Sequence, residues 1–396
     1  HPFGAPALSK VAKQRPLWGR LVRGLLTFVI AVAALAVSFE FAMQNPAVNG
    51  AVRCTVQETF YEQRWESPPP GTPVIEATAV TEPVRDACDA ADDPAIWVHP
   101  SRPEESLIIG TNKQRSLNVY GLNGRLVDRR DNLGAPNNAD IRTMAGRTIV
   151  AASDKDGAEI EVFELIDGTL LPLSGGPVPA KAEEELYGLC LYRTQQTLFA
   201  FSTDKSGLIV QYRLGVDPTE GITATPVREL GLPSQIEGCA VDDAAGRLFV
   251  GEEDIGIWSF DASPDGASEG TLIARTGSDG VLTADVEGIA IYAPASSASN
   301  EGFLIASSQG NSSYAVFDRA PPHRFRGRFQ LAFQGELIGD TDGLEVTAAP
   351  LGDRFPRGML VVQDGYIRDA AGARRNQRFA MVSWADIETA LSLQPD

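Results

Sequence analysis

Short runs of apolar residues, each ending in a polar tip, recur along the chain. The runs are LIIGTNK (107–113), TIVAASDK (148–155), LFAFSTDK (198–205), LFVGEED (248–254), FLIASSQGN (303–311) and MLVVQDG (359–365). A buried strand is about 4–8 residues long, so runs of this length favour strands over helices. The first residues of successive tips are 42, 50, 49, 56 and 55 positions apart. Self-similarity at such a period indicates a repeat architecture.

Two further strand patterns accompany each tipped strand, always in the same order. One ends in an aromatic residue, as in LNVYGL, IEVFEL, IVQYRL, IWSFDA, YAVFDR and AMVSWA. The other precedes the tipped strand and reads DDPAIWV, NNADIRT, LYGLCLY, IEGCAVD, VEGIAIY and TDGLEVT. Six units of about fifty residues, each with three or four short strands, predict an all-β, six-bladed β-propeller. A solenoid is the competing architecture, but it usually has shorter units and distinct end caps.

The last unit ends after FAMVSWADI and lacks an outer strand. The segment VIEATAV (74–80) is rich in β-forming residues, so we expect it to pair there and close the ring. The propeller domain is therefore expected to span residues 73–396, and the Pro-rich residues 46–72 are expected to form a linker.

Residues 1–45 have the pattern of an export signal or an N-terminal membrane anchor. Five basic residues precede sixteen residues without a charge, 24–39, which contain the small-residue stretch Ala34-Leu35-Ala36. A membrane-spanning helix needs about 20 residues, so this segment is short for an anchor. We expect a protein that is secreted, periplasmic or on the outer cell surface, and an uncleaved membrane tether stays open.

The composition supports many turns and few long helices, because the chain has 38 Gly and 26 Pro. Its net charge of −18 argues against nucleic acid as a partner, since phosphate-binding surfaces are usually basic. Cys54 and Cys88 flank the connector ESPPPGTPV, and a disulfide between them stays open. Cys190 and Cys239 lie in apolar strand patterns, so we expect them to be small core residues.

In a propeller, equivalent positions of successive units meet around a central channel. The strands that precede the tips carry acids at positions we interpret as equivalent: Asp92, Asp93, Asp140, Glu237, Asp285, Glu287, Asp340 and Asp342. The tips themselves add Lys113, Lys155, Lys205, Glu253 and Asp364, and Arg142 and Tyr187 belong to the same ring. Carboxylates gathered at ~4–6 Å repel one another unless they are neutralised.

Oxygen ligands without His or Cys point to Ca²⁺ as the neutralising ion. Lys113, Arg142 and Lys205 suit the oxygens of a phosphate group. The alternative is that these residues are solvated turn residues and salt bridges between blades.

The chain resembles the β-propeller phytases over about residues 75–390. The matching segments are DACDAADDPAIWVHP, TNKQRSLNVYGLNG, NNADIR, YGLCLY, EGCAVDD, GEEDIGIWSFDA, PDGASEGT, DVEGIAIY, ASSQGNSSYAVFDR, DTDGLEV and VVQDG. The resemblance implies a six-bladed, calcium-dependent enzyme that removes phosphates from phytate (myo-inositol hexakisphosphate).

The resemblance also implies roles for individual residues. Active-site calcium ions would be held by Asp92, Asp93, Glu237, Glu253, Asp285 and Glu287, and stabilising calcium ions by Gln309, Asp342 and Asp364. The phosphate that is cleaved would be contacted by Lys113, Arg142, Tyr187 and Lys205. The implied chemistry is direct attack on phosphorus by a calcium-activated water, with Glu237 among the catalytic residues. The sequence contains no RHGxRxP, HCxxxxxR or P-loop stretch, which agrees with a route that has no phosphoenzyme.

Three positions depart from the family pattern. Gln114 follows Lys113 where the family has a second Lys, which leaves Arg115 as a substitute. His99 replaces an acid. The segment 333–343 is shorter and lacks one acid, which puts one calcium site in doubt unless Glu336 or Asp340 compensates.

Two other functions remain open at this stage. One is a different calcium-dependent propeller hydrolase, of the lactonase or phosphotriesterase type, and the other is a non-catalytic binding propeller at the cell surface. The three predicted cations favour phosphomonoesters, because a neutral substrate would gain little from them. We expect a monomer whose partners are calcium phytate and the phosphate product.

Overall fold

The computed structural model describes residues 52, 54–55, 66–217, 221–278, 280–294, 301–372 and 374–393. The chain divides into two units, His1–Arg53 and Cys54–Asp396, and the fold described below is that of the second. The predicted export segment, 1–45, and most of the predicted linker, 46–72, lie outside the described residues. No helix in the described part of the chain is both long and apolar enough to cross a bilayer.

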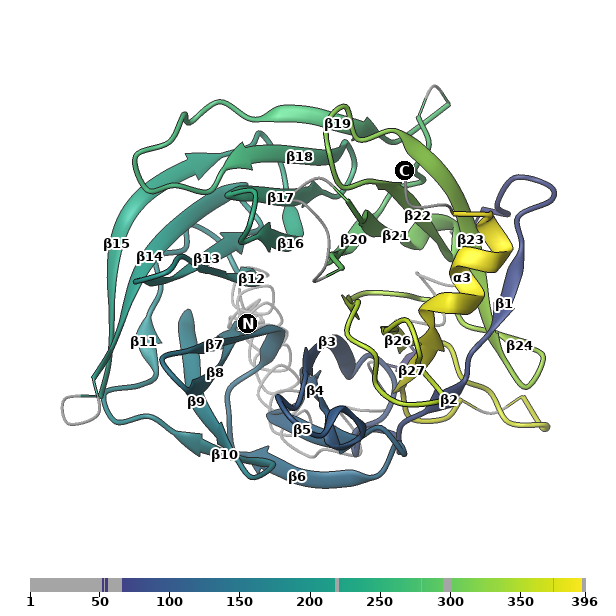
Figure 1. The fold of residues 1–396 in the computed structure, drawn as a ribbon, viewed down its shortest axis with the longest axis horizontal. Helices are drawn as coiled ribbons and strands as arrows, with labels where there is room; N and C mark the ends of the chain where they lie inside the picture. The colour runs from purple at the N-terminus through teal and green to yellow at the C-terminus, as the bar shows by residue number, and fades with distance from the viewer. Residues whose placement is uncertain are drawn as a thin grey trace, which may run out of the picture. The chain divides into compact units, whose positions relative to one another are not determined.

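Six sheets are arranged as blades around a central axis (Figure 1), and their innermost strands line a cavity there, called the channel below. The first blade consists of β3 (Ala91–Trp97), β4 (Leu107–Asn112), β5 (Ser116–Gly121) and β6 (Leu126–Asp131). The second consists of β7 (Pro136–Met144), β8 (Arg147–Asp154), β9 (Glu159–Ile166), β10 (Thr169–Pro172) and the short β11 (Val178–Pro179). The third consists of β12 (Leu186–Arg193), β13 (Leu198–Asp204), β14 (Leu208–Asp217) and β15 (Gly221–Gly231).

The other three blades complete the ring. The fourth consists of β16 (Ile236–Asp242), β17 (Arg247–Glu252), β18 (Gly256–Asp261) and β19 (Thr271–Arg275). The fifth consists of β20 (Val286–Tyr292), β21 (Phe303–Ser308), β22 (Ser313–Asp318), β23 (Phe325–Phe333) and β24 (Glu336–Leu337). The sixth contains β25 (Leu344–Thr347), β26 (Met359–Asp364) and β27 (Arg378–Ser383). The prediction of a six-bladed β-propeller is therefore confirmed.

The N-terminal segment contributes strands to two blades. β1 (Val74–Glu76) pairs in parallel with β23 of the fifth blade, where Ile75 lies opposite Leu331. β2 (Ala79–Val80) pairs antiparallel with β27 of the sixth blade. The segment predicted to be one outer strand, 74–80, is therefore shared between the fifth and sixth sheets.

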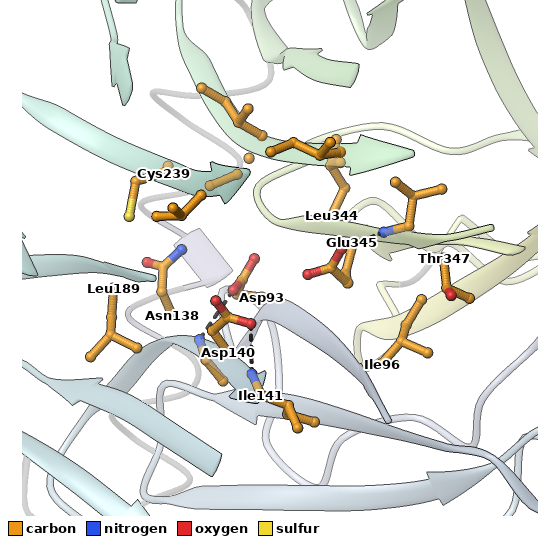
Figure 2. Close-up of a pocket in the computed structure, with 18 of the residues that line it drawn as sticks. Asp93, Ile96, Asn138, Asp140, Ile141, Leu189, Cys239, Leu344, Glu345 and Thr347 are labelled. Atoms are coloured by element: carbon orange, nitrogen blue, oxygen red, sulfur yellow. Dashed lines mark hydrogen bonds between the residues drawn. The ribbon is translucent and has the colours of Figure 1, made fainter. Parts of the chain in front are cut away.

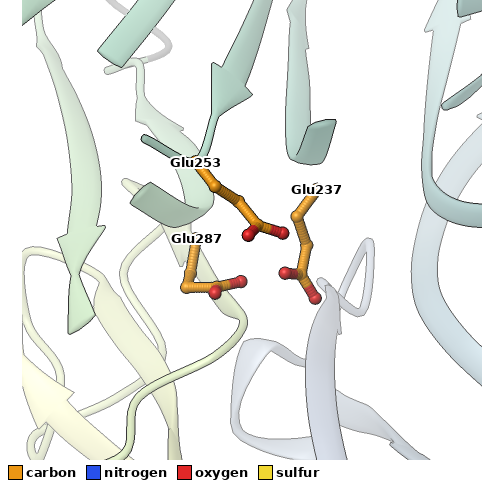
Figure 3. Close-up of side chains that lie close together, drawn as sticks. All are labelled: Glu237, Glu253 and Glu287. Atoms are coloured by element: carbon orange, nitrogen blue, oxygen red, sulfur yellow. The ribbon is translucent and has the colours of Figure 1, made fainter. Parts of the chain in front are cut away.

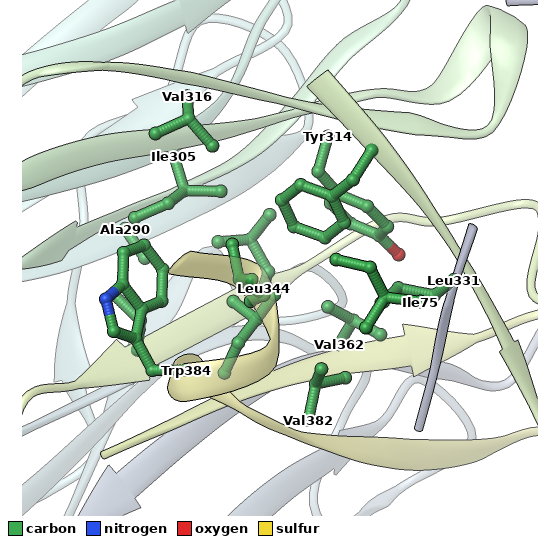
Figure 4. Packing of buried hydrophobic residues seen from close by; sticks show 14 of the residues in the cluster. Ile75, Ala290, Ile305, Tyr314, Val316, Leu331, Leu344, Val362, Val382 and Trp384 are labelled. Atoms are coloured by element: carbon green, nitrogen blue, oxygen red, sulfur yellow. The ribbon is translucent and has the colours of Figure 1, made fainter. Parts of the chain in front are cut away.

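Apolar clusters lie between neighbouring blades. One cluster joins the fifth and sixth blades through residues such as Ile305, Val316, Leu344 and Val362 (Figure 4). Helix α3 (Trp384–Leu391), which the strand patterns do not predict, follows β27 and completes this cluster. Its fully buried Trp384 stacks on Tyr292, with ring centres 4.0 Å apart. Burial of one such side chain stabilises the fold by roughly 1.5–3 kcal/mol.

Two disulfides are present in the described residues. Cys54 is bonded to Cys88, the pairing that the sequence left open. Cys190 is bonded to Cys239, so the expectation that these two are unpaired core residues is wrong. Cys190 lies on β12 and Cys239 on β16, the innermost strands of neighbouring blades, with Cα atoms 5.8 Å apart. The sequence hides this proximity because 49 positions separate the two residues.

Candidate active site and metal centre

Five of the six innermost strands are bulged near their first residue. The register shifts lie between Ala91 and Pro94, Pro136 and Ala139, Leu186 and Leu189, Ile236 and Cys239, and Val286 and Ile289. A bulge places an extra residue in one strand and re-aims its side chain. The first residue within each bulge is Asp92, Asn137, Tyr187, Glu237 or Glu287. The bulges therefore gather polar side chains from successive blades at one end of the channel.

Glycines follow several of these polar residues and allow neighbouring blades to approach closely. A Cβ atom on Gly188 would lie 1.9 Å from the carbonyl oxygen of Glu237 in the next blade. A Cβ atom on Gly238 would lie 2.2 Å from the carbonyl oxygen of Glu287 in the blade after that. A side chain at either position would push the inner strands apart. In the pairs Tyr187-Gly188 and Glu237-Gly238, the first residue supplies a functional side chain. The glycine that follows leaves room for the backbone carbonyl of the next blade.

Three glutamates converge at this end of the channel (Figure 3). Glu237, Glu253 and Glu287 each present a carboxylate oxygen, and these oxygens lie within 4.8 Å of one another. Burial and the Glu237 carboxylate raise the pKa of Glu287 well above its ordinary value. Burial, Glu237 and Asp285 raise the pKa of Glu253 to about 8. Such values mean that, without a cation, the cluster retains protons at neutral pH.

The donor set fits a divalent cation. Among the described residues, Oε2 of the buried Glu287 has no hydrogen-bond partner, which is costly for a carboxylate oxygen unless an ion faces it. Two unit charges 4 Å apart repel by about 4 kcal/mol near a protein surface, so three ionised glutamates need a counter-charge. Their ligand atoms are all oxygens, the type that Ca²⁺ prefers.

A second group of charges adjoins the glutamates. Lys113 Nζ lies 3.3 Å from Asp92, 3.1 Å from Asp342 and 2.6 Å from Asp89. Gln309 donates a 2.6 Å hydrogen bond to the other carboxylate oxygen of Asp342. Burial raises the pKa of Asp92 to about 6, while Lys113 lowers and Glu237 raises it, so the two groups interact electrostatically.

A lysine pair brackets Tyr187. Lys155 Nζ lies 4.3 Å and Lys205 Nζ 4.6 Å from the centre of the tyrosine ring. Both ammonium groups also contact Glu185, at 3.5 and 2.9 Å respectively. The Glu237 carboxylate and burial raise the pKa of Tyr187. Its hydroxyl therefore stays protonated and is available as a hydrogen-bond donor beside the glutamates.

The channel interior contains a third set of acids. A cavity of about 220 Å³ is lined by the inner strands, with Asp93, Asp140 and Glu345 facing it (Figure 2). Asp93 accepts a hydrogen bond from the backbone N–H of Ala139, and Asp140 accepts one from that of Leu191. Burial and Asp92 raise the pKa of Asp93 well above its ordinary value. Asp93 thus faces the channel, next to Asp92 at the channel end.

The side chain of Arg142 does not lie near the three glutamates. Its guanidinium lies 2.7 Å from Asp140 and 3.0 Å from Asp243. Asp243 directly follows the last residue of β16, whereas Glu237 is the second residue of the same strand. Six residues of strand span roughly 20 Å at ~3.3 Å each, so the Arg142 guanidinium lies at the opposite end of the channel.

The side chain of Asp364 also lies away from the glutamates and contacts an arginine. It ends β26 and pairs with Arg378 on β27, with 3.0 Å between Oδ2 and Nε. It borders a separate cavity of about 920 Å³ that Asn311 and Arg368 also line. Apart from Asp93, Arg142 and Asp364, the predicted site residues therefore lie around the glutamates and Lys113, and Asp364 lies beside an arginine.

Three residues near the site were not selected from the sequence. Asp89 and Glu185 contact the site lysines, and Glu345 faces the channel with a pKa that burial raises to about 8. Asp89 and Glu185 lie just before an inner strand, at loop positions without a repeating pattern. Glu345 lies three residues after Asp342, as Asp140 lies three residues after Asn137, and alignment of the inner-strand motifs on these polar residues would have found it.

The fold and the site together define a β-propeller whose channel end combines an all-oxygen cation cluster with lysines suited to an anionic substrate. A family model described as "Phytase" matches residues 71–396. The chain is 40% identical over 339 residues to the 3-phytase of Bacillus subtilis (strain 168), which covers 81% of this chain and 86% of that protein.

The β-propeller domain of Cps50 (Swd1) from Myceliophteria thermophila is a more distant structural match. It has a TM-score of 0.41 and 10% identity, covers 74% of this chain and 83% of that chain, and adds nothing to the argument. The family match and the Bacillus relative are sufficient: the chain belongs to the phytase family and is an enzyme.

Proposed function

We propose that this enzyme removes phosphates from phytate in a calcium-dependent reaction. The observation that carries the proposal is the cluster of Glu237, Glu253 and Glu287, whose oxygens lie within 4.8 Å of one another beside a group of lysines. The 3-phytase from Bacillus supports the choice of substrate. A calcium ion there would neutralise both the carboxylates and the phosphate oxygens and lower the pKa of the attacking water.

The calcium ligands are assigned by position. Glu237, Glu253 and Glu287 would hold the ions nearest the reaction, and Asp92 and Asp285 would extend this set. Gln309 and Asp342, which are hydrogen-bonded to each other, would hold a neighbouring stabilising ion. Asp93, which lines the channel cavity, would serve as a further carboxylate ligand.

The phosphate contacts come from cations and one hydroxyl at the same end of the channel. Lys113 and Lys205 bind the phosphate oxygens by charge-assisted hydrogen bonds. Tyr187, held between Lys155 and Lys205, donates a hydrogen bond from its hydroxyl to a phosphate oxygen and fixes the orientation of the group. Glu237, close to both Tyr187 and the other glutamates, orients the attacking water. Positioning and charge neutralisation therefore supply most of the rate.

Attack on phosphorus is direct in this proposal, without a phosphoenzyme. Two other functions predict different results: a lactonase or phosphotriesterase would act on neutral esters, and a binding propeller would release no product. The lysines around Tyr187 favour an anionic substrate over a neutral one. Turnover of a simple lactone without release of phosphate from phytate would select the first alternative.

The deciding experiment measures phosphate release from phytate with calcium and with a chelator. We expect the chelator to abolish activity and added calcium to restore it. Glu237→Gln should lose at least ~100-fold in kcat, the order expected when a catalytic carboxylate is removed. Glu104→Gln, an exposed glutamate on the 3₁₀ turn Pro103–Glu105, is the matched control and should retain activity. Full activity in the chelator would overturn the proposal.

We also propose that the enzyme works outside the cytoplasm as a monomer, either secreted, periplasmic or on the outer cell surface. The two disulfides support this, because such bonds persist in oxidising compartments. Cell fractionation with a phytase assay on intact cells tests the location, and gel filtration tests the oligomeric state.

A further inference from the structure

We propose that the disulfide between Cys190 and Cys239 is a positioning element of the active site, and that its reduction by a dithiol weakens the metal centre before the fold is lost. The inference rests on the proposed roles of Tyr187 and Glu237. Cys190 lies three residues after Tyr187 on β12, and Cys239 lies two residues after Glu237 on β16. The bond therefore joins the two strands beside their functional side chains.

This link crosses a boundary that backbone pairing does not cover. β12 belongs to the sheet of the third blade and β16 to that of the fourth. At this level the two blades meet through the close approach of Gly188 to the carbonyl of Glu237. The Thr203 hydroxyl adds a long hydrogen bond of 3.3 Å to the same carbonyl. A covalent bond directly beside these contacts fixes the spacing between Tyr187 and Glu237.

The site depends on the position of β16, the strand that carries Glu237. Glu237 faces Glu253 and Glu287 on its other side, with carboxylate oxygens within 4.8 Å. The three carboxylates meet only while β16 keeps its position between β12 of the third blade and β20 of the fifth. β12 and β16 are each bulged at this point, so the ladder of each to the next strand of its own blade is locally interrupted. The disulfide ties β16 to β12 directly after these interruptions, where the ladders have resumed: Cys190 is paired with Phe201 and Cys239 with Val250.

We infer that a small reductant approaches the bond from the channel, because Cys239 keeps 9% of its surface exposed and Cys190 only 1%. Cys239 lines the channel cavity, and its sulfur is visible there in Figure 2. A dithiol attacks one sulfur as a thiolate and forms a mixed disulfide, and its second thiolate then displaces the remaining cysteine. The products are two cysteine thiols and a cyclic disulfide of the reagent, so two electrons pass to the protein. The reduced cysteines remain within the apolar cluster of Phe201, Ile236 and Val250, which holds the fold.

The chain has four cysteines, which permits a clean test. In the Cys54→Ser/Cys88→Ser variant the only bond left is the one between Cys190 and Cys239. Reduction of this variant should raise the calcium concentration for half-maximal phytate hydrolysis, and the calcium Kd from calorimetry, by about tenfold, because a ~1 Å misplacement costs up to ~100-fold. Far-UV circular dichroism should stay unchanged.

The Cys190→Ala/Cys239→Ala variant is the counterpart. It should show the weakened calcium binding without any reductant, and a dithiol should weaken it no further. High calcium should restore part of its kcat/KM. A purely structural disulfide would lower Tm but leave the calcium Kd of the folded protein at the wild-type value, and that result would overturn the inference.

Two further outcomes are decisive. If calcium binding and the far-UV circular dichroism signal decrease in parallel during reduction, the inference is also wrong, since the bond would then stabilise the fold alone. If the oxidised wild type binds calcium but releases no phosphate from phytate, the proposed function fails. The calorimetric comparison of oxidised and reduced protein still decides the role of the disulfide in that case.

Discussion

The backbone of Gly188 lies directly against the carbonyl group of Glu237, so a Cβ atom at residue 188 would come within 1.9 Å of that oxygen. The contact joins the third blade to the fourth, and Gly238 repeats it between the fourth blade and Glu287 of the fifth. These residues lie in the bulges that carry the site. The distance between neighbouring blades therefore determines how far apart the three glutamate carboxylates lie.

Gly188→Ala should therefore disable the enzyme through a methyl group that touches no substrate. The clash is with backbone, which cannot rotate away, so β12 and β16 must separate and Glu237 must leave Glu253 and Glu287. We expect phytate hydrolysis to fall by about 100-fold. Gly231→Ala is the control, because the nearest atom to its Cβ would be 3.8 Å away. Equal activity of the two variants in a phytate assay would show that the inner strands tolerate separation.

The metal-free enzyme should become less stable as the pH rises. The pKa of Asp92 is raised from 3.8 to about 6 and that of Glu253 from 4.5 to about 8, chiefly by burial. The folded chain therefore binds these protons more tightly than the unfolded chain does. Their stabilising effect is complete below the unfolded pKa values and is lost as the pH passes through about 6 and about 8.

Thermal unfolding in a chelator, followed across this pH range, checks the prediction. We expect Tm to fall with rising pH in the chelator, and calcium to remove most of that fall because it replaces the lost protons. Glu253→Gln should flatten the upper part of the curve. A metal-free Tm that rises over the same range would contradict the burial and charge crowding described above.

Much of the fold follows from the period of the strand patterns. The apolar runs and their polar tips recur because every blade repeats the same inner strands, so convergence of Glu237, Glu253 and Glu287 could be predicted from residues far apart in sequence. The similarity of the strand motifs also predicts Arg142 and Asp140 in this ring, because the motif NNADIRT starts one position later than the motifs with glutamate. Aligned on the bulge, Asn137 rather than Asp140 corresponds to Glu237, and Arg142 corresponds to Asp242 at the far end of the strand.

Other features depend on contacts that no pattern encodes. The Cys190–Cys239 bond depends on the lateral spacing of two blades, which the period alone does not set. Arg378 faces Asp364 because β26 and β27 are paired in one particular register across a long hairpin. Helix α3 was missed because its eight residues follow directly on a strand and replace no repeat element.

Substitution at Arg142 should separate a structural role from a substrate role. Arg142 pairs with Asp140 and Asp243, both largely buried, so Arg142→Gln should lower the free energy of unfolding by roughly 3 kcal/mol. Its KM for phytate should stay within about twofold of wild type, because the guanidinium lies at the other end of the channel.

Lys113→Gln is the comparison and should raise KM by about tenfold or more, since one charge-assisted hydrogen bond contributes ~1.5–3 kcal/mol. Lys181→Gln, at an exposed lysine in the loop between β11 and β12, controls for loss of positive charge. A KM effect of Arg142→Gln as large as that of Lys113→Gln would restore Arg142 as a phosphate contact.

Asp364 offers a test of the predicted stabilising calcium site. Its carboxylate is buried and lies 3.0 Å from Nε of Arg378, whose guanidinium carbon lies 4.9 Å from the centre of the Phe333 ring. The guanidinium of Arg378 therefore already neutralises the carboxylate of Asp364. Asp364→Asn should lower the free energy of unfolding by about 1–3 kcal/mol, and by the same amount with calcium and with chelator, because the lost partner is an arginine.

Glu287→Gln provides the contrast within the same measurement. Glu287 belongs to the glutamate cluster, so its substitution should reduce the gain in Tm that calcium gives the wild type. If Asp364→Asn reduces that gain as much as Glu287→Gln does, then calcium competes with Arg378 for Asp364, and the carboxylate is a metal ligand as the sequence predicts. If the gain is unchanged, the arginine has taken the place of the ion at this blade.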